Sequence, residues 1–301
     1  MIKLFSKTRI VKLISLLALV LLVSAAYLYY RHYQSQKTVA LPVSSQTNLP
    51  TANAASHLSW IIQYHFLSLI QQNSAASNEF ARANKIYVIL SKKEAASGIA
   101  AKPVFNNLVL TDYFNSYSQF VADYNNHQIN PAVKAVLFDD SSDTPASVVP
   151  TVEANNPYQY DQLFSNFAHQ HGMVSMCDYI LGKRIHAKQG LAPPCDIAVL
   201  NYSQQSERDA SKYSQVVSSA VAVIHATNPN MPVLVGISTN PRGPVINPSQ
   251  IVASVAATYK SVSGYWISVP TSGGIGCPNC SPQNPAILPV FLQDLFEQSI
   301  Y

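Results

Sequence analysis

The segment from Cys195 to Asn240 constrains the fold more than any other part of the chain. Ile197–Leu200 and Val233–Ile237 are short apolar runs of the length that is typical of strands buried on both faces. Between them, apolar side chains recur at helical spacing, at Tyr213, Val216, Val217, Ala220, Val221 and Ile224. Two buried strands joined by a helix of this length predict a right-handed parallel crossover.

The same alternation of strand and helix extends over most of the chain. The other candidate strands are Ile86–Leu90, Leu108–Leu110, Val133–Phe138, Met173–Cys177 and Tyr265–Val269. The candidate helices are Tyr117–Tyr124, Tyr158–His171, Ala210–Thr227, Ser249–Val262 and Pro289–Gln298, with an earlier one expected over Trp60–Ile70 and extended by Asn78–Asn84. This pattern predicts an α/β fold, and its spacing favours a (β/α)8 TIM-barrel-like domain whose eighth strand the pattern does not place. A doubly wound open sheet is the alternative.

Residues that begin and end helices mark the expected boundaries. Asp209 precedes its helix as an N-cap, and Asn156-Pro157 and Asn247-Pro248 each place an N-cap before a proline at the first helical position. Gly172 and Gly264 are expected to end the helices before them. No strand is followed by Gly-x-Gly-x-x-Gly, so a dinucleotide site is disfavoured and no cofactor is expected.

The N-terminal region predicts export. Residues 1–12 carry four positive charges and form a cytoplasmic basic flank, and residues 13–33 contain an uncharged, mostly apolar stretch from Leu13 to Tyr30. We expect a single-pass signal-anchor here, with the domain after it outside the cell membrane, or alternatively a cleaved signal peptide and a secreted protein. Residues 34–57 are rich in Ser, Gln, Thr, Ala and Pro and predict a flexible linker, so residues 58–301 form the extracytoplasmic barrel domain.

The net charge of +4 comes from the N-terminal region. Of the 19 basic residues, six precede residue 38, which leaves 13 against 15 acidic residues and a charge of −2 on the remainder. Nucleic-acid binding depends on positive charge, so nucleic acid is not expected as a partner.

The four cysteines are Cys177, Cys195, Cys277 and Cys280. Export predicts disulfides, and of the three pairings we favour Cys177 with Cys195 and Cys277 with Cys280. A redox dithiol at Cys277-Pro-Asn-Cys280 and a four-cysteine zinc site are the alternatives. The histidines show no ligand spacing, and we expect no metal.

Carboxylates follow the predicted strands at the barrel end where TIM-barrel enzymes act. Asp139 and Asp140 are the main candidates, because adjacent residues of a strand point to opposite sides and one of them can face the barrel mouth. Asp178 or Glu207 would complete the pair that glycoside hydrolysis requires. The alternative is that the aspartates only accept hydrogen bonds from the loops, and that Glu207 only lies near a helix N-terminus.

Other side chains at the same ends are candidates for substrate binding. Tyr113, Tyr202 and Trp266 could stack on sugar rings, although Trp266 also fits a buried packing role. Asn240 and Arg242 follow a further strand, and Arg242 could meet an anionic group or remain a surface residue.

Six segments carry a resemblance to a known group of proteins. They are Ile-Tyr-Val-Ile-Leu-Ser-Lys-Lys-Glu-Ala (86–95), Leu-Phe-Asp-Asp (137–140), Asn-Pro-Tyr-Gln-Tyr (156–160), Ala-His-Gln-His-Gly (168–172), Gly-Ile-Ser-Thr-Asn-Pro (236–241) and Gly-Tyr-Trp-Ile-Ser-Val-Pro (264–270). In these segments the chain resembles exported bacterial proteins with glycoside-hydrolase-type TIM barrels, which implies that fold over most of residues 85–285. Two functions follow as hypotheses: an enzyme acting on envelope or extracellular glycans, or a non-catalytic surface barrel that binds glycan or protein.

Overall fold

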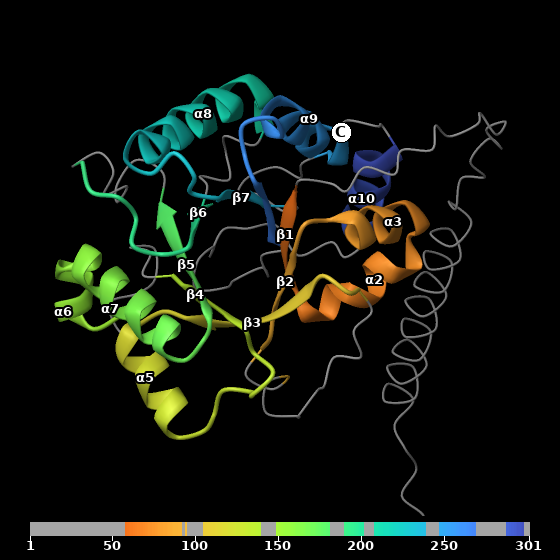
Figure 1. The fold of residues 1–301 in the computed structure, drawn as a ribbon. Coiled ribbons are helices and arrows are strands. Elements are labelled where there is room, and N and C mark those ends of the chain that lie inside the picture. Colours follow the sequence, from red (N-terminus) through yellow and green to blue (C-terminus); the bar gives the residue numbers. More distant parts are fainter. Residues whose placement is uncertain are drawn as a thin grey trace, which may run out of the picture. The chain divides into compact units, whose positions relative to one another are not determined.

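The computed structural model describes residues 58–91, 94, 105–139, 149–180, 190–201, 208–238, 247–268 and 287–297 (Figure 1). All of these belong to one compact unit, residues 53–301. The expected basic flank, transmembrane segment and linker lie outside the described residues. Among the helices that are described, none has the length and apolar character needed to cross a membrane.

Eight parallel strands close into a barrel in which each strand pairs with the next and β8 pairs with β1. The strands are β1 (Ser59–Gln63), β2 (Ile86–Ile89), β3 (Leu108–Phe114), β4 (Ala135–Phe138), β5 (Val174–Ile180), β6 (Ile197–Asn201), β7 (Val233–Ser238) and β8 (Gly264–Ser268). The predicted (β/α)8 barrel is confirmed. The open-sheet alternative is wrong, because pairing of the first strand with the last leaves no free sheet edge.

The strand that the sequence pattern does not place is β1. The helix expected over Trp60–Ile70 is wrong in its first part, because Trp60, Ile61 and Ile62 are all buried in a strand. A run that is apolar on both faces has no period of its own, so a strand and a helix look alike there. The chain then turns through η1 (Tyr64–Phe66) into α2 (Leu67–Gln72), and α3 (Ser74–Arg82) is a separate helix rather than an extension.

The remaining helices lie outside the strands, as a barrel of this type requires. They are α5 (Tyr117–Asn125), α6 (Thr151–Asn155), α7 (Pro157–Gln170), α8 (Ala210–Thr227), α9 (Pro248–Thr258) and α10 (Ile287–Glu297). In Figure 1, α5, α6 and α7 form one group, α8 lies beside α9, and α10 lies beside α3. The bounds of α8 coincide with the prediction, and those of α5, α7 and α10 differ from it by one or two residues. α9 ends at Thr258 where Val262 was expected, and α6 was not predicted.

Two of the predicted helix starts are confirmed in their capping contacts. The Asp209 carboxylate accepts from the Lys212 backbone N–H at 3.1 Å. Asn247 accepts from Ser249 N–H at 3.2 Å, and the Gln250 side chain reaches back to the Asn247 backbone to complete a capping box. Asn156 does not cap in this way, because its side-chain amide donates to the carbonyl of Val152 instead.

The two glycines that were expected to end helices behave differently. Gly172 follows α7 with a φ of +69°, a left-handed conformation that favours glycine. Gly264 is instead the first residue of β8, so its predicted capping role is wrong. Its lack of a side chain serves the close approach of β1, because a methyl group there would overlap the backbone of Ser59.

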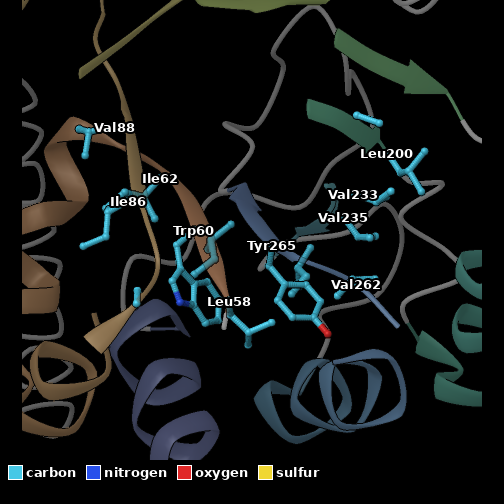
Figure 2. Packing of buried hydrophobic residues seen from close by; sticks show 14 of the residues in the cluster. Leu58, Trp60, Ile62, Ile86, Val88, Leu200, Val233, Val235, Val262 and Tyr265 are labelled. Carbon is cyan, nitrogen blue, oxygen red and sulfur yellow. The ribbon is translucent and has the colours of Figure 1, made fainter. Parts of the chain in front are cut away.

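The strands divide the core into an inner and an outer cluster. Inside the barrel lie Ile61, Tyr87, Ala135, Leu137, Met176, Ile197, Val199 and Leu234. Outside, Trp60 and Tyr265 lie side by side between the strands and the helices, with their ring centroids 5.7 Å apart (Figure 2). The Tyr265 hydroxyl contacts the Thr258 hydroxyl at 2.8 Å and so joins β8 to α9. Because side chains alternate along each strand, a residue two positions after a member of the inner cluster also points to the inside, nearer the barrel mouth.

Candidate functional site

A polar layer lies above the inner cluster, at the C-terminal ends of the strands. Asp139, Asp178 and Asn201 each follow an inner-cluster residue by two positions, namely Leu137, Met176 and Val199. Alternation along the strands therefore turns all three side chains toward the barrel interior. Tyr113 of β3 packs against the same inner cluster from its upper side. Functional groups of TIM barrels lie at this end.

Asp139 and Asp178 lie at the same level of neighbouring strands. Phe138 of β4 is in register with Cys177 of β5, so the next positions along the two strands are Asp139 and Asp178. Neighbouring strands are about 4.8 Å apart. Both aspartates are buried, with exposed fractions of 6% and 2%. The fold thus brings two of the predicted carboxylates to one level of the barrel.

Asp139 is held by two residues from the end of β3. The Tyr113 hydroxyl donates to Asp139 Oδ2. Asn115 Nδ2 donates both to the Tyr113 hydroxyl and to the Asp139 carbonyl oxygen, each at 3.1 Å. The Asp139 backbone N–H donates to the carbonyl of Phe114 at 2.8 Å. Both the side chain and the backbone of Asp139 are therefore fixed from β3.

Asp178 is held by Asn201 at the end of β6. The Asn201 backbone N–H donates to Asp178 Oδ1 and its side-chain amide donates to Oδ2, both at 3.1 Å. Sequence reasoning missed Asn201 and Asn115. The signal for Asn201 was its place directly after the apolar run Ile197–Leu200, where the strand continues by one inward-facing residue.

The charges of this layer act on Tyr113. Burial raises the pKa of the Tyr113 phenol well above its usual range, and the negative charge of Asp139 and the hydrogen bond to it raise this pKa further. The charge of Asp178 acts in the same direction, while the hydrogen bond from Asn115 acts in the opposite one. The phenol is therefore neutral at physiological pH and can act as a hydrogen-bond donor, not as a base.

Trp266 enters the barrel interior from the opposite side. It lies on β8, four strands from β4 in either direction around the barrel, and packs against the inner cluster. Its indole N–H is buried and, among the described residues, has no hydrogen-bond acceptor. Trp266 thus combines the packing role with a donor that remains available inside the barrel.

The other predicted site residues lie outside the described residues. They are Asp140, Glu207, Tyr202, Asn240, Arg242, Cys277 and Cys280. Cys177 and Cys195 form a disulfide, with their Cα atoms 5.8 Å apart, so the first predicted pairing is confirmed. Disulfides are typical of oxidising compartments outside the cytosol.

A second polar cluster lies at the other end of the strands, around Asp196. Its Oδ2 contacts His169 Nε2 at 2.8 Å and accepts from the backbone N–H and the hydroxyl of Ser175 at 2.8 and 3.0 Å. The serine hydroxyl contacts the aspartate and not the histidine, so this is not the order of a nucleophilic triad. Burial acts to raise the pKa of Asp196, but the hydrogen bonds from Ser175 and His169 outweigh it and lower that pKa.

The Asp196 cluster also reaches Tyr87, an inner-cluster residue of β2. Burial and the charge of Asp196 raise the pKa of the Tyr87 phenol to about 12. The cluster ties α7, β5 and β6 together at the N-terminal face, where contacts in TIM barrels serve stability. Neither here nor elsewhere in the described part of the chain do three His, Cys, Asp or Glu side chains gather in a way that could hold a metal ion.

No family model and no curated protein sequence matches the chain. Solved structures with a similar fold include a glucosidase from Croceicoccus marinus (12% identity, 68% of this chain and 52% of that one, TM-score 0.45). The carboxyl transferase domain of Rhizobium etli pyruvate carboxylase (8%, 81% and 48%, TM-score 0.43) and tryptophan synthase subunit alpha from Legionella pneumophila (13%, 70% and 79%, TM-score 0.41) are also similar. The chain spans about half the length of the first two. Likeness at this level carries no argument about activity, and the barrel is established by its own strand pairing.

Proposed function

We propose that this barrel is a carbohydrate-active hydrolase with Asp139 and Asp178 as its carboxylate pair. The observation that carries the proposal is the placement of two buried carboxylates at one level of adjacent strands, in the polar layer of the mouth. Glycoside hydrolysis needs two carboxyl groups, and in retaining enzymes these are about 5–5.5 Å apart. The spacing of adjacent strands, about 4.8 Å, is compatible with that arrangement.

The hydrogen bonds divide the roles between the two aspartates. Asn201 donates to both oxygens of Asp178, so a proton on either oxygen would displace one of these hydrogen bonds. Asp178 is therefore assigned as the ionised group that attacks or stabilises the anomeric carbon. Asp139 is then the group that exchanges protons: it gives one to the leaving oxygen when it is protonated and takes one from water when it is ionised. Trp266, across the barrel, packs against the inner cluster with a buried indole N–H. We propose that its ring contacts the sugar when the substrate enters the mouth.

One observation favours a second function, a barrel that binds glycan without cleaving it. The carboxylates of Asp139 and Asp178 both accept hydrogen bonds from neighbouring side chains of the same polar layer. Carboxylates held in this way can serve to build a rigid mouth. In either function we place the barrel outside the cell membrane, tethered through residues 13–33, and the Cys177–Cys195 disulfide supports an oxidising location.

A glycan-array screen of the full chain, followed by a hydrolysis assay on each bound glycan, tests the proposal. Asp139→Asn and Asp178→Asn should each reduce cleavage by about 10²–10⁴-fold while binding persists. Asp209→Asn is the matched control, because asparagine caps a helix as well as aspartate does. Binding by the parent protein without any cleavage would reject the hydrolase and favour the binding barrel.

A further inference from the structure

We propose that Tyr113 is a positioning residue that acts through Asp139, and that Asn115 fixes the direction of the Tyr113 hydroxyl. The consequence for catalysis rests on the proposed function, whereas the hydrogen-bonded arrangement itself does not. This role differs from the sugar-stacking role expected from the sequence.

The hydrogen bonds leave the Tyr113 hydroxyl one arrangement. A phenol has one proton to donate and can accept at its oxygen. Asn115 Nδ2 is a donor and occupies the accepting side of the oxygen at 3.1 Å, so the phenol proton goes to Asp139 Oδ2. Asn115 also donates to the Asp139 carbonyl, and one amide thus sets the position of both partners.

Because the Tyr113 phenol keeps its proton, it remains a hydrogen-bond donor to Asp139. Burial and the charges of Asp139 and Asp178 all oppose loss of the phenol proton. Tyr113 therefore donates to Asp139 throughout the physiological pH range. This donor holds Oδ2 of Asp139, so the orientation of the Asp139 carboxylate is set from β3.

Asn115 is itself held by the start of α5. The next residue, Ser116, caps this helix by accepting from the Gln119 backbone N–H at 3.1 Å. Glu153 of α6, which is only 1% exposed, accepts from the backbone N–H groups of Tyr117 and Ser118 at 2.8 and 3.1 Å. The backbone around Asn115 is thus fixed from within α5 and from α6, so the amide is a rigid support for Tyr113.

Nuclear magnetic resonance of protein labelled at tyrosine Cζ tests the arrangement without any substrate. Tyr113→Phe identifies the Tyr113 signal among the 17 tyrosines. In the parent protein this signal should remain that of the neutral phenol at the pH where an ordinary tyrosine deprotonates, about 10. In Asp139→Asn, which removes the charge and the carboxylate acceptor but leaves the burial of the phenol, deprotonation should begin at a lower pH than in the parent protein. Asp209→Asn should leave the signal unchanged. A Tyr113 signal that titrates identically in the parent and in Asp139→Asn would overturn the proposal.

The catalytic consequence is tested on whichever glycan the parent cleaves. Tyr113→Phe keeps the ring and should lower kcat by about tenfold with KM changed less than twofold, as expected when one oriented hydrogen bond of about 1.4 kcal/mol is lost. Asn115→Ala should lower kcat in the same direction, and Asn115→Asp, which cannot donate, should not restore it. A raised KM with unchanged kcat in Tyr113→Phe would refute positioning and restore the stacking role. If no glycan is cleaved but the Tyr113 signal responds to Asp139→Asn, the hydrogen-bonded arrangement is supported and the hydrolase function is rejected.

Discussion

The substitution Gly264→Ala tests the seam of the barrel, which is the pairing of β1 with β8 that closes the sheet. Gly264 begins β8 and is in register with Ser59 of β1, and the Ser59 N–H donates to the carbonyl of Ser263 at 2.8 Å. A methyl group on Gly264 would overlap the Ser59 carbonyl oxygen and lie 2.7 and 2.8 Å from the carbonyl carbon and the nitrogen of Ser59. These are backbone atoms, which cannot rotate away as the end of a long side chain can. The two strands must therefore separate at the position where the sheet closes.

The loss in free energy of unfolding caused by Gly264→Ala has two parts that add. Overpacking in a well-packed interior costs about 1–3 kcal/mol. Separation of β1 from β8 also weakens seam hydrogen bonds, each of which contributes about 1 kcal/mol. We expect a loss of about 3–5 kcal/mol in the free energy of unfolding, measured from the midpoint of urea denaturation followed by circular dichroism.

Gly172→Ala is the matched control for this prediction. It makes the same chemical change at a residue where a methyl group would meet nothing within 4 Å, although φ is +69°. Its cost should be limited to backbone strain, about 1–2 kcal/mol. A loss below about 1 kcal/mol for Gly264→Ala, or one equal to that of Gly172→Ala, would refute the argument from steric closure.

Three further predictions concern the contacts that surround the barrel. Asp196→Asn should destabilise the protein at pH 7, and the difference should vanish in acid. Because the pKa of Asp196 is lower in the folded protein than its value of about 3.9 in the unfolded chain, its carboxylate stabilises the fold above that pH. This stabilisation is lost as the pH falls through the pKa of the folded state. Urea midpoints measured between about pH 7 and 2.5 would show the loss. Removal of the disulfide in Cys177→Ala/Cys195→Ala should lower the free energy of unfolding by about 3 kcal/mol for its 18-residue separation, and a reductant should lower the urea midpoint of the parent protein more than that of this variant. Glu153→Gln should cost about 2 kcal/mol by urea denaturation, because an amide cannot accept at both ends from Tyr117 and Ser118, and an unchanged midpoint would contradict the capping role of this carboxylate.

Most of the fold could be predicted from the sequence because its helices carry apolar stripes at helical spacing and most of its strands are short apolar runs between them. The helix Ala210–Thr227 carries one apolar stripe and a capping aspartate, and its bounds were predicted correctly. β1 could not be recognised in the same way. Its residues Trp60 and Ile62 face the helices while Ile61 faces the barrel interior, so burial on both sides erased the alternation that marks a strand.

The candidate site was predictable in its carboxylates but not in their partners. Asp139 and Asp178 follow apolar runs, and the rule that barrel sites lie at the ends of strands was enough to select them. Their relation to Tyr113 and Asn201 depends on the register of β3 with β4 and of β5 with β6, which no local pattern contains. Asn115 was missed because an asparagine between a strand and a helix is ordinarily a turn or capping residue.

The pairing of β1 with β8 also means that the barrel cannot close until β8 has been synthesised. Ser59 and Gly264 are paired although 205 positions separate them. Until the ribosome has made β8, the growing chain therefore carries two open sheet edges, at β1 and at the last strand made. Such edges are templates for pairing with other chains. A chain that stalls or is truncated before residue 264 should therefore aggregate, because only a chain that includes β8 can close the sheet.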